Sequence, residues 1–424
     1  MITLFNYLLV FNIFSSGFVL FSSPVEFYLG YVFIVLFLIF YGWNFPTIGI
    51  NSNFLIIMII LSASSLINVC GGNNTFFLVA KQVFGILITG SAYYLLMKVN
   101  KFDVDKLFKI YLRIALIVSM IGIFQEFSFL IGFKNGYDYS WLLQKCYFTP
   151  TTGGLLRVNS IFVEPSHFAI SMAPAFFVAL LNIFRKKSAF LHLRLANLIV
   201  VISYFLTFSI IAYIVALISP FLFPFANKKR YFSIILILGV FFSLGAYFFL
   251  PEIKSRVDDT IKVAIGSAKT TKSHLTVYAY HSNGFVAFKS FADSPFFGHG
   301  LGSHPVSYDQ FIRPDADTAD IFWAKGYTGI NKNDSNSLFL RLVSETGLFG
   351  LVVAFYFLYH FRVKDIERKD LYILNNAVLL LFIAQLLRQG HYFANGLFFF
   401  VWLYYFSSKI DRRSFFKSVQ EKNE

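Results

Sequence analysis

Long apolar runs separated by short polar breaks cover most of the chain, and this pattern predicts membrane-spanning helices. A run of about 20 apolar residues is long enough for a helix to cross the hydrocarbon core. By this criterion the 424 residues contain about twelve spans. They lie near residues 2–21, 27–43, 54–69, 76–98, 107–133, 164–184, 195–209, 211–226, 231–250, 337–359, 371–388 and 393–408. The expected fold is an all-α polytopic membrane protein.

The longest polar stretches divide this helical bundle into parts. Residues 1–250 are expected to form an N-terminal helical membrane part, with a first outer loop near 134–163. Residues 251–336 form a large extracytoplasmic loop between the ninth and tenth spans, residues 337–408 the C-terminal transmembrane helices, and residues 409–424 a cytoplasmic tail. A connection as long as 251–336 exceeds ordinary loop lengths, so we expect a small outer cap on the bundle.

Two stretches of the apolar pattern need further argument. The first run, 2–21, lacks a basic start and a small-residue cleavage site, so we interpret it as a retained span. Residues 195–226 could form one long span, but basic residues flank the stretch at both ends. A hairpin that turns near Thr207 to Ser209 keeps both basic flanks on the cytoplasmic side, as the positive-inside rule requires.

Composition and charge support the membrane interpretation. Hydrophobic residues make up 57% of the chain and charged residues only 14%, against about 25% charged in ordinary soluble domains. The net charge of +14 could indicate a nucleic-acid partner. With both termini inside, however, the cytoplasmic side collects 21 of the 36 Lys and Arg but 8 of the 22 Asp and Glu. Topology therefore accounts for the charge, and no nucleic acid is expected.

Polar side chains gather at the mouth of one apolar span, in the stretch RVNSIFVEPSHFAIS from Arg157 to Ser171. Pro165, with Glu164 and Ser166 beside it, is typical of a helix start. A helix cap needs only one such side chain, and Arg157 has no capping role. A guanidinium at the outer membrane surface can hold phosphate oxygens in a bidentate fork, which favours a lipid diphosphate as ligand.

Further polar residues recur near the outer ends of other spans. Lys81 and Glu126 lie at similar depth in neighbouring antiparallel spans, where they could form an ion pair or line a cavity. Arg388 lies at the outer end of the eleventh predicted span and His391 follows it, and Arg388 could either bind substrate or extend to the interface. Four loop residues, Lys289, His299, His304 and Arg313, could simply be solvated, while Asn336 and Arg341 lie where the large loop enters the tenth span.

The sequence contains no metal or cofactor motif. The Cys and His residues do not have the spacing typical of zinc or haem sites, and the chain has no Walker-type or G-x-G-x-x-G stretch. We therefore expect no metal and no cofactor. Cys70 and Cys146 both fall outside in the predicted topology. Such a compartment permits a disulfide, and two free thiols are the alternative.

Several motifs, taken in order, resemble one known family. Arg157 precedes F-V-E-P-S at 162–166, a T-F-S turn lies at 207–209, D-S-P-F-F-G-H-G-L-G-S occupies 293–303, and S-N-S-L-F-L at 335–340 precedes E-T-G-L-F-G at 345–350. This arrangement resembles the O-antigen polymerase (Wzy-type) and O-antigen ligase superfamily, and the resemblance covers most of the chain from Arg157 onward.

The resemblance implies a glycosyltransferase of the bacterial cytoplasmic (inner) membrane that acts on the outer face. Its substrate would be an undecaprenyl-diphosphate-linked oligosaccharide, and the transfer would be independent of metal. A sugar hydroxyl would attack the anomeric carbon, and the lipid diphosphate would leave. Arg157 matches the family arginine, and Arg388 is a second candidate for stabilising the leaving diphosphate.

Two departures favour the polymerase branch. Ligases commonly carry a His-Asn pair where this chain has Ser335 and Asn336, and Glu164-Pro165-Ser166 resembles the polymerase pattern. Either Glu164 or His167 could accept the proton of the acceptor hydroxyl. The catalytic candidates are therefore Arg157, Glu164 and His167. The substrate-binding candidates are Lys81, Lys289, Arg313, Asn336, Arg341, Arg388 and His391.

The sequence leaves alternatives open. A ligase that moves finished polymer to a lipid or protein acceptor would use the same fold. A transporter for lipid-linked oligosaccharide is the alternative of another class, but its charged residues would be expected in the middle of the spans, with small outer loops. A chain-length regulator and a flippase are partners that the sequence neither requires nor excludes.

Overall fold

The computed structural model describes most of the chain in detail. The described residues are 1–22, 26–44, 51–148, 150–151, 153–183, 193–223, 251–265, 269–315, 319–323, 326, 328–393 and 396–423, with scattered residues between 233 and 248. The predicted span at 231–250 and parts of the predicted cytoplasmic loops fall largely outside them. The side chains of the predicted cytoplasmic tail are described only as far as Arg412.

Helices dominate the described part of the chain and coincide with the predicted spans. Six of them are long and apolar enough to cross a membrane: α4 (Ser52–Cys70), α5 (Phe76–Val99), α6 (Val104–Leu130), α8 (Pro165–Ile183), α16 (Leu338–His360) and α17 (Lys369–Leu387). Shorter apolar helices are α1 (Ile2–Phe11) with η1 (Asn12–Phe14), α2 (Leu29–Tyr41), α9 (Arg194–Phe205), α10 (Ile210–Ile218) with η4 (Ser219–Leu222), and the apolar start of α18 (Leu397–Asn423). The helical membrane architecture is thus confirmed, whereas the number of crossings stays a prediction.

Local sequence signals explain where several of these helices begin. The Thr75 hydroxyl accepts the Leu78 N–H at 3.4 Å ahead of α5. The Ser337 hydroxyl accepts the Leu340 N–H at 3.1 Å ahead of α16. Such caps satisfy N–H groups that the first turn of a helix leaves without a partner. Likewise α9 ends at Phe205 and α10 begins at Ile210, which confirms the predicted turn.

The N-terminal run differs from the prediction of a single span over 2–21. Its helix ends at Phe14, and the chain then forms a two-stranded antiparallel hairpin from β1 (Val19–Phe21) and β2 (Phe27–Tyr28). The Ser15 hydroxyl bonds back to the Asn12 carbonyl at 3.0 Å, which ends the helix. At Gly17 a Cβ would lie 2.6 Å from the Ile161 carbonyl oxygen, so the chain passes close to the segment before α8. The purely α-helical expectation is therefore wrong here.

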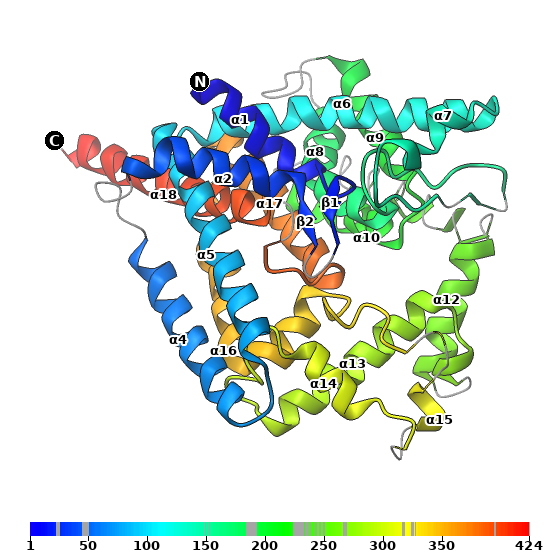
Figure 1. The fold of residues 1–424 in the computed structure, drawn as a ribbon. Helices are drawn as coiled ribbons and strands as arrows, with labels where there is room; N and C mark the ends of the chain where they lie inside the picture. Colours follow the sequence, from blue (N-terminus) through cyan, green and yellow to red (C-terminus); the bar gives the residue numbers. More distant parts are fainter. Residues whose placement is uncertain are drawn as a thin grey trace.

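The remaining helices belong to two polar segments. Residues 134–141 form α7 (Lys134–Tyr137) and η3 (Tyr139–Trp141), and η2 (Gly42–Asn44) follows α2. The large polar segment forms α12 (Pro251–Ala264), η5 (Thr270–Lys272), α13 (Leu275–Asp293), α14 (His304–Phe311) and α15 (Ala319–Phe322). Figure 1 shows α13, α14 and α15 together at the lower end of the molecule, beside the lower ends of α4, α5 and α16.

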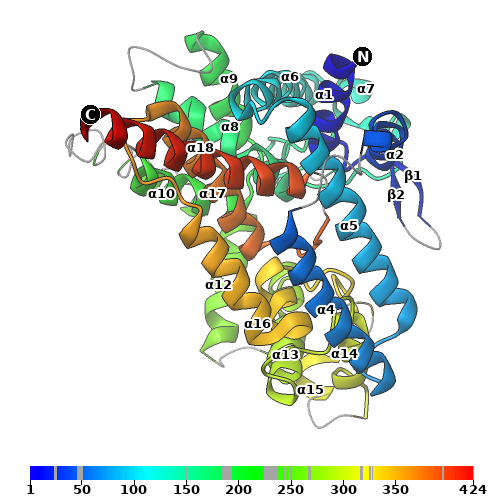
Figure 2. The same ribbon diagram turned by 90° about the vertical axis from the view of Figure 1, so that its left-hand side faces the viewer.

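The core is formed where α8 and α17 pack against each other and against α9, α10 and α18. Both α8 and α17 bury 72% of their most apolar window, whereas α4 buries 11% and packs mainly on α5 at the periphery. Figure 2 shows α4 and α5 side by side, running from the bundle down to the polar helices. The arrangement leaves the N-terminal hairpin, the start of α8 and the loops around α16 and α17 facing one another.

Candidate functional site

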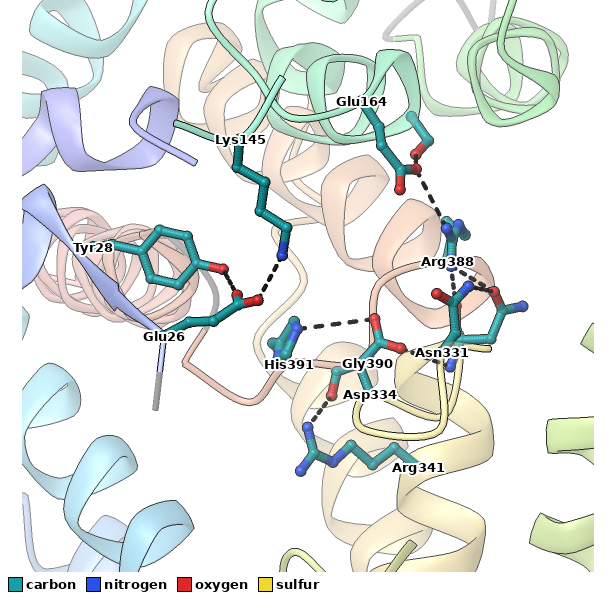
Figure 3. A network of polar contacts seen from close by, with 12 residues as sticks. Glu26, Tyr28, Lys145, Glu164, Asn331, Asp334, Arg341, Arg388, Gly390 and His391 are labelled. Atoms are coloured by element: carbon teal, nitrogen blue, oxygen red, sulfur yellow. Dashed lines mark hydrogen bonds and ion pairs between the residues drawn. The ribbon is translucent and has the colours of Figure 1, made fainter. Parts of the chain in front are cut away.

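A cavity of about 580 Å³ lies between five segments that are distant in sequence. It is lined by residues of the β1–β2 hairpin with the α2 helix that follows it, α5, the segment that leads into α8, the loop before α16 and the loop between α17 and α18. Five of the predicted site residues line it, namely Lys81, Glu164, His167, Arg388 and His391. Figure 3 shows the polar network around this cavity.

Arg388 follows the last residue of α17 and directs its guanidinium towards the start of α8 (Figure 3). Its Nη2 lies 3.4 Å from Glu164 Oε2, and its Nη1 donates to the Asn336 carbonyl at 3.2 Å. The side-chain oxygen of Asn336 accepts a second hydrogen bond from Nη1. These contacts hold the cation at the cavity wall.

Glu164 immediately precedes Pro165, the first residue of α8, which confirms the predicted helix start. Ser166 Oγ donates to Glu164 Oε2 at 3.0 Å. Burial raises the pKa of the Glu164 carboxyl, but the charges of His167 and Arg388 and the Ser166 hydrogen bond outweigh it, so the pKa lies below its usual value. The cavity therefore contains an ionised carboxylate at this position at neutral pH.

His391 lies near the middle of the network, beside Asp334 from the loop before α16 (Figure 3). Its Nε2 is 3.9 Å from Asp334 Oδ2. Burial lowers the pKa of His391 to about 4, and the charge of Asp334 opposes this only in part. The 40% of the His391 side chain that remains exposed lines the cavity. The imidazole is consequently neutral at physiological pH.

The N-terminal hairpin contributes a second ion pair on the opposite side of the network (Figure 3). Lys145 Nζ lies 2.6 Å from Glu26 Oε1, and the Tyr28 hydroxyl donates to Glu26 Oε2. Burial raises the pKa of Glu26, but the contacts with Lys145 and Tyr28 lower it by a larger amount, so the pKa lies below its usual value. This carboxylate also remains ionised.

Lys81 lines the cavity from the second turn of α5. The predicted alternative, an ion pair with Glu126, is wrong. Both oxygens of Glu126 instead accept the Leu156 N–H, at 3.3 and 3.1 Å. Among the described residues, no hydrogen bond or ion pair reaches the Lys81 ammonium.

The segment that carries Arg157 is held in place by α6. Glu126 accepts from the residue before Arg157, and Gln125 Oε1 accepts the N–H groups of Asn159 and Ser160 at 3.2 and 2.8 Å. Arg157 does not line the cavity, but its charge contributes to lowering the pKa of Glu164. Arg157 is thus close enough to Glu164 for its charge to act on that carboxylate.

The other predicted site residues lie apart from the cavity lining. Arg341 is 1% exposed and is paired with Glu345 inside the protein. Lys289 is exposed on α13, and Arg313 is exposed with its Nε 3.8 Å from Asp315. Asn336 is buried, and its contribution to the site is the hydrogen bonding to Arg388.

Within the part of the chain that the structure describes, no group of three or more His, Cys, Asp or Glu side chains could hold a metal ion. Cys70 and Cys146 are free thiols, which excludes the disulfide alternative in this structure.

Comparison with known proteins gives the family. Residues 169–355 match the family model described as O-antigen ligase. This match supports membership of the O-antigen ligase and polymerase superfamily. No curated protein matches the sequence. Membership of this superfamily supports an enzyme of polysaccharide assembly in a bacterial membrane.

The superfamily match runs from within α8 to within α16, so it includes the large polar segment with the motif at 293–303 and the motif at 345–350 in α16. The cavity cations Lys81, Lys145 and Arg388 lie outside the matched residues, whereas the cavity residue Lys332 lies within them.

Sequence reasoning missed four charged residues of the cavity, Glu26, Lys145, Lys332 and Asp334. Glu26 lies in the short break between the predicted spans 2–21 and 27–43, and Lys145 lies in an outer loop without a motif. Asp334 stands within N-D-S-N-S, next to the recognised S-N-S-L-F-L motif, and that proximity is a signal that could have identified it. No local pattern indicates the contact of Glu26 with Lys145, because 119 residues separate them.

Proposed function

We propose that this protein polymerises undecaprenyl-diphosphate-linked oligosaccharide repeat units into O-antigen, capsule or exopolysaccharide. The reaction would take place on the outer face of the cytoplasmic membrane, without a metal ion. The observation that carries the proposal is the cavity lined by Lys81 and Arg388 together with Glu164 and His391. A cavity with cations of this kind, bordered by helices that are apolar enough to cross a membrane, suits a diphosphate whose lipid tail stays in the bilayer.

In the proposed reaction, the oxygen of an acceptor sugar hydroxyl attacks the anomeric carbon of the donor glycan. The bond from that carbon to the diphosphate oxygen breaks, and the lipid diphosphate leaves with the bonding electrons. Lys81 and Arg388 would stabilise the negative charge that develops on the diphosphate. Arg157, the arginine indicated by the resemblance, would add positive charge beside the cavity.

The acceptor hydroxyl must lose a proton during this attack, and two groups are candidates to receive it. Glu164 is an ionised carboxylate on the cavity wall, although its pairing with Arg388 weakens it as a base. His167 lines the cavity one turn further into α8. We favour Glu164, because its carboxylate is also oriented by Ser166.

Two observations bear on the choice between polymerase and ligase. Ser335 stands where ligases commonly have histidine, and it is fully buried, while Asn336 is engaged by Arg388. This arrangement supports polymerase, because the histidine that a ligase would use is absent. The matching family model is described as O-antigen ligase, and this keeps ligase as the second candidate.

The test is to delete the gene in its host and to analyse surface polysaccharide on a gel, with a parallel assay of lipid-linked glycan. A polymerase predicts that single repeat units still reach their acceptor while the ladder of longer chains disappears. If long polymer accumulated on its lipid carrier, the protein would be a ligase and the polymerase proposal would be wrong. Lipid-linked repeats trapped on the inner face would identify a transporter and overturn both.

Complementation then tests the site. Wild-type protein should restore the ladder, whereas Arg388→Ala and Arg157→Ala should not, although both variants accumulate in the membrane. Full activity of the Arg388→Ala variant would contradict the proposal that the reaction takes place in the cavity. Full activity of Arg157→Ala would remove the role that the resemblance assigns to that residue.

A further inference from the structure

A buried ion pair in α16 connects two loops that are distant in sequence. Arg341 and Glu345 lie one turn apart, with Arg341 Nε 3.0 Å from Glu345 Oε1 and the two side chains 1% and 0% exposed. Burying two charges is costly unless further hydrogen bonds satisfy them. Their remaining partners therefore indicate what the pair does.

Glu345 binds the large polar segment. Its Oε2 accepts the Gly302 N–H at 2.7 Å, and its Oε1 accepts the His304 N–H at 3.4 Å. The His304 ring in turn lies 2.9 Å from Ser344 Oγ and 3.0 Å from Asn283 Oδ1. The turn at 298–304 is thereby attached to α16.

Arg341 binds the segment after α17. Its Nη1 donates to the Gly390 carbonyl at 3.0 Å, and its guanidinium carbon lies 4.5 Å from the centre of the Tyr392 ring. Gly390 stands between Gln389 and His391, both of which line the cavity, and follows Arg388 by two residues. Figure 3 shows Arg341 below Gly390, beneath the cavity residues.

We infer that the buried Arg341–Glu345 pair positions the segment 388–392, and that Arg341 acts on the reaction through Arg388 and His391 without contacting substrate. Arg341 is not among the residues that line the cavity. Glu345 also binds the turn at 298–304. The ion pair therefore fixes the position of segment 388–392 relative to the helices of the large polar segment. This inference rests on the proposed function, since it assumes that a lipid diphosphate binds at Arg388.

The variant for the test must avoid leaving one buried charge without its partner, because that alone can unfold the protein. Arg341→Met combined with Glu345→Gln removes both charges and keeps an oxygen that can accept the Gly302 N–H. Arg341→Lys keeps the positive charge and the reach to Gly390. The matched control is Arg362→Met, which removes an arginine bonded to Asn376 and outside the cavity lining.

The measurement is binding of undecaprenyl diphosphate to the purified full-length protein in detergent, with amount and melting temperature recorded for each variant. We expect the double variant to fold and to bind about tenfold more weakly, corresponding to about 1.4 kcal/mol. Arg341→Lys should recover part of the loss, and Arg362→Met should bind like wild type.

A double-mutant cycle with Arg388→Ala separates positioning from a general structural effect. If Arg341 acts through Arg388, the two losses will not add, and the combined variant will bind no more weakly than Arg388→Ala alone. Losses that add fully, or a double variant that binds like wild type, would overturn the inference. Wild-type protein that fails to bind undecaprenyl diphosphate would instead contradict the proposed function, so the two failures are distinguishable.

Discussion

Lys81 lies in a membrane-spanning helix without an acidic partner among the described residues, and its position on the cavity wall suits an anionic ligand. Lys81→Met keeps most of the aliphatic stem and removes the charge. We expect binding of undecaprenyl diphosphate to weaken about tenfold or more, because a hydrogen bond to a charged group contributes about 1.5–3 kcal/mol. Lys289→Met, at an exposed position on α13 outside the cavity, is the control and should bind normally. Equal binding by the two variants would exclude Lys81 from the site.

Glu164 should set the acidic limb of the pH–rate profile if it accepts the acceptor proton. A base works only when ionised, and the lowered pKa keeps Glu164 ionised to more acidic pH than an ordinary glutamate. Ser166→Ala removes the hydrogen bond to Glu164 Oε2, so it should move the acidic limb of kcat/KM to higher pH. Glu164→Gln should lower the rate about a hundredfold or more and abolish that limb.

The competing assignment has a different outcome in the same experiment. If His167 accepts the proton, the acidic limb will persist in Glu164→Gln and disappear in His167→Gln. A profile that Ser166→Ala leaves unchanged would also contradict Glu164 as the base.

Among the elements, the loop after α17 packs tightly against the loop before α16. A Cβ on Gly390 would lie 1.8 Å from the Asp334 carbonyl oxygen, so Gly390→Ala must displace this loop or the loop before α16. We expect a loss of stability of about 1–3 kcal/mol, as for other overpacked positions, together with loss of activity. Melting temperature and polymer formation in the same preparation measure both effects.

Gly284→Ala is the matched control for that substitution. Nothing lies within 4 Å of a Cβ at Gly284 in α13, so alanine should be tolerated there and should stabilise the helix by about 0.5–1 kcal/mol. If Gly390→Ala behaved like Gly284→Ala, the tight loop would not matter for the site.

The elements themselves were largely predictable, because their signals are local. Apolar length predicted the helices, and capping side chains such as Thr75 and Ser337 explain their starts. Apolar length did not predict the β1–β2 hairpin. The helix breaks at Ser15 and Gly17, which lie inside a run that is otherwise long and apolar enough for a span. The position of a break within an apolar run depends on contacts with distant segments.

At the scale of the whole molecule, five of the residues that line the cavity were candidates from the sequence, but the contacts between them were not predictable. Arg388 and Glu164 were both candidates, yet 224 residues separate them and only the fold brings them together. Lys81 and Glu126 were expected at similar depth, but depth does not determine which way a side chain faces. Arg341 was expected to bind substrate, but it is buried in an ion pair with Glu345. A sequence motif cannot distinguish an arginine that contacts a ligand from one in an internal ion pair.

The two cysteines allow a test of the predicted orientation of the whole molecule. Cys70 is exposed at the end of α4, and Cys146 lies half-buried in the segment before α8. Burial raises the pKa of the Cys146 thiol, and its Sγ accepts a hydrogen bond from Asn159 at 3.3 Å. Because maleimides react with the thiolate, Cys146 should react slowly. The predicted topology places both thiols outside.

A membrane-impermeant maleimide applied to intact cells, with the outer membrane made permeable where there is one, should therefore label the wild-type protein mainly at Cys70. Cys70→Ser should remove most of the label, and Cys146→Ser should remove little. If Cys70 were labelled only after the cytoplasmic membrane is disrupted, the orientation of the protein would be the opposite of the predicted one. The large polar segment and the loops around the cavity would then face the cytoplasm, and the proposed reaction on the outer face would have to be abandoned.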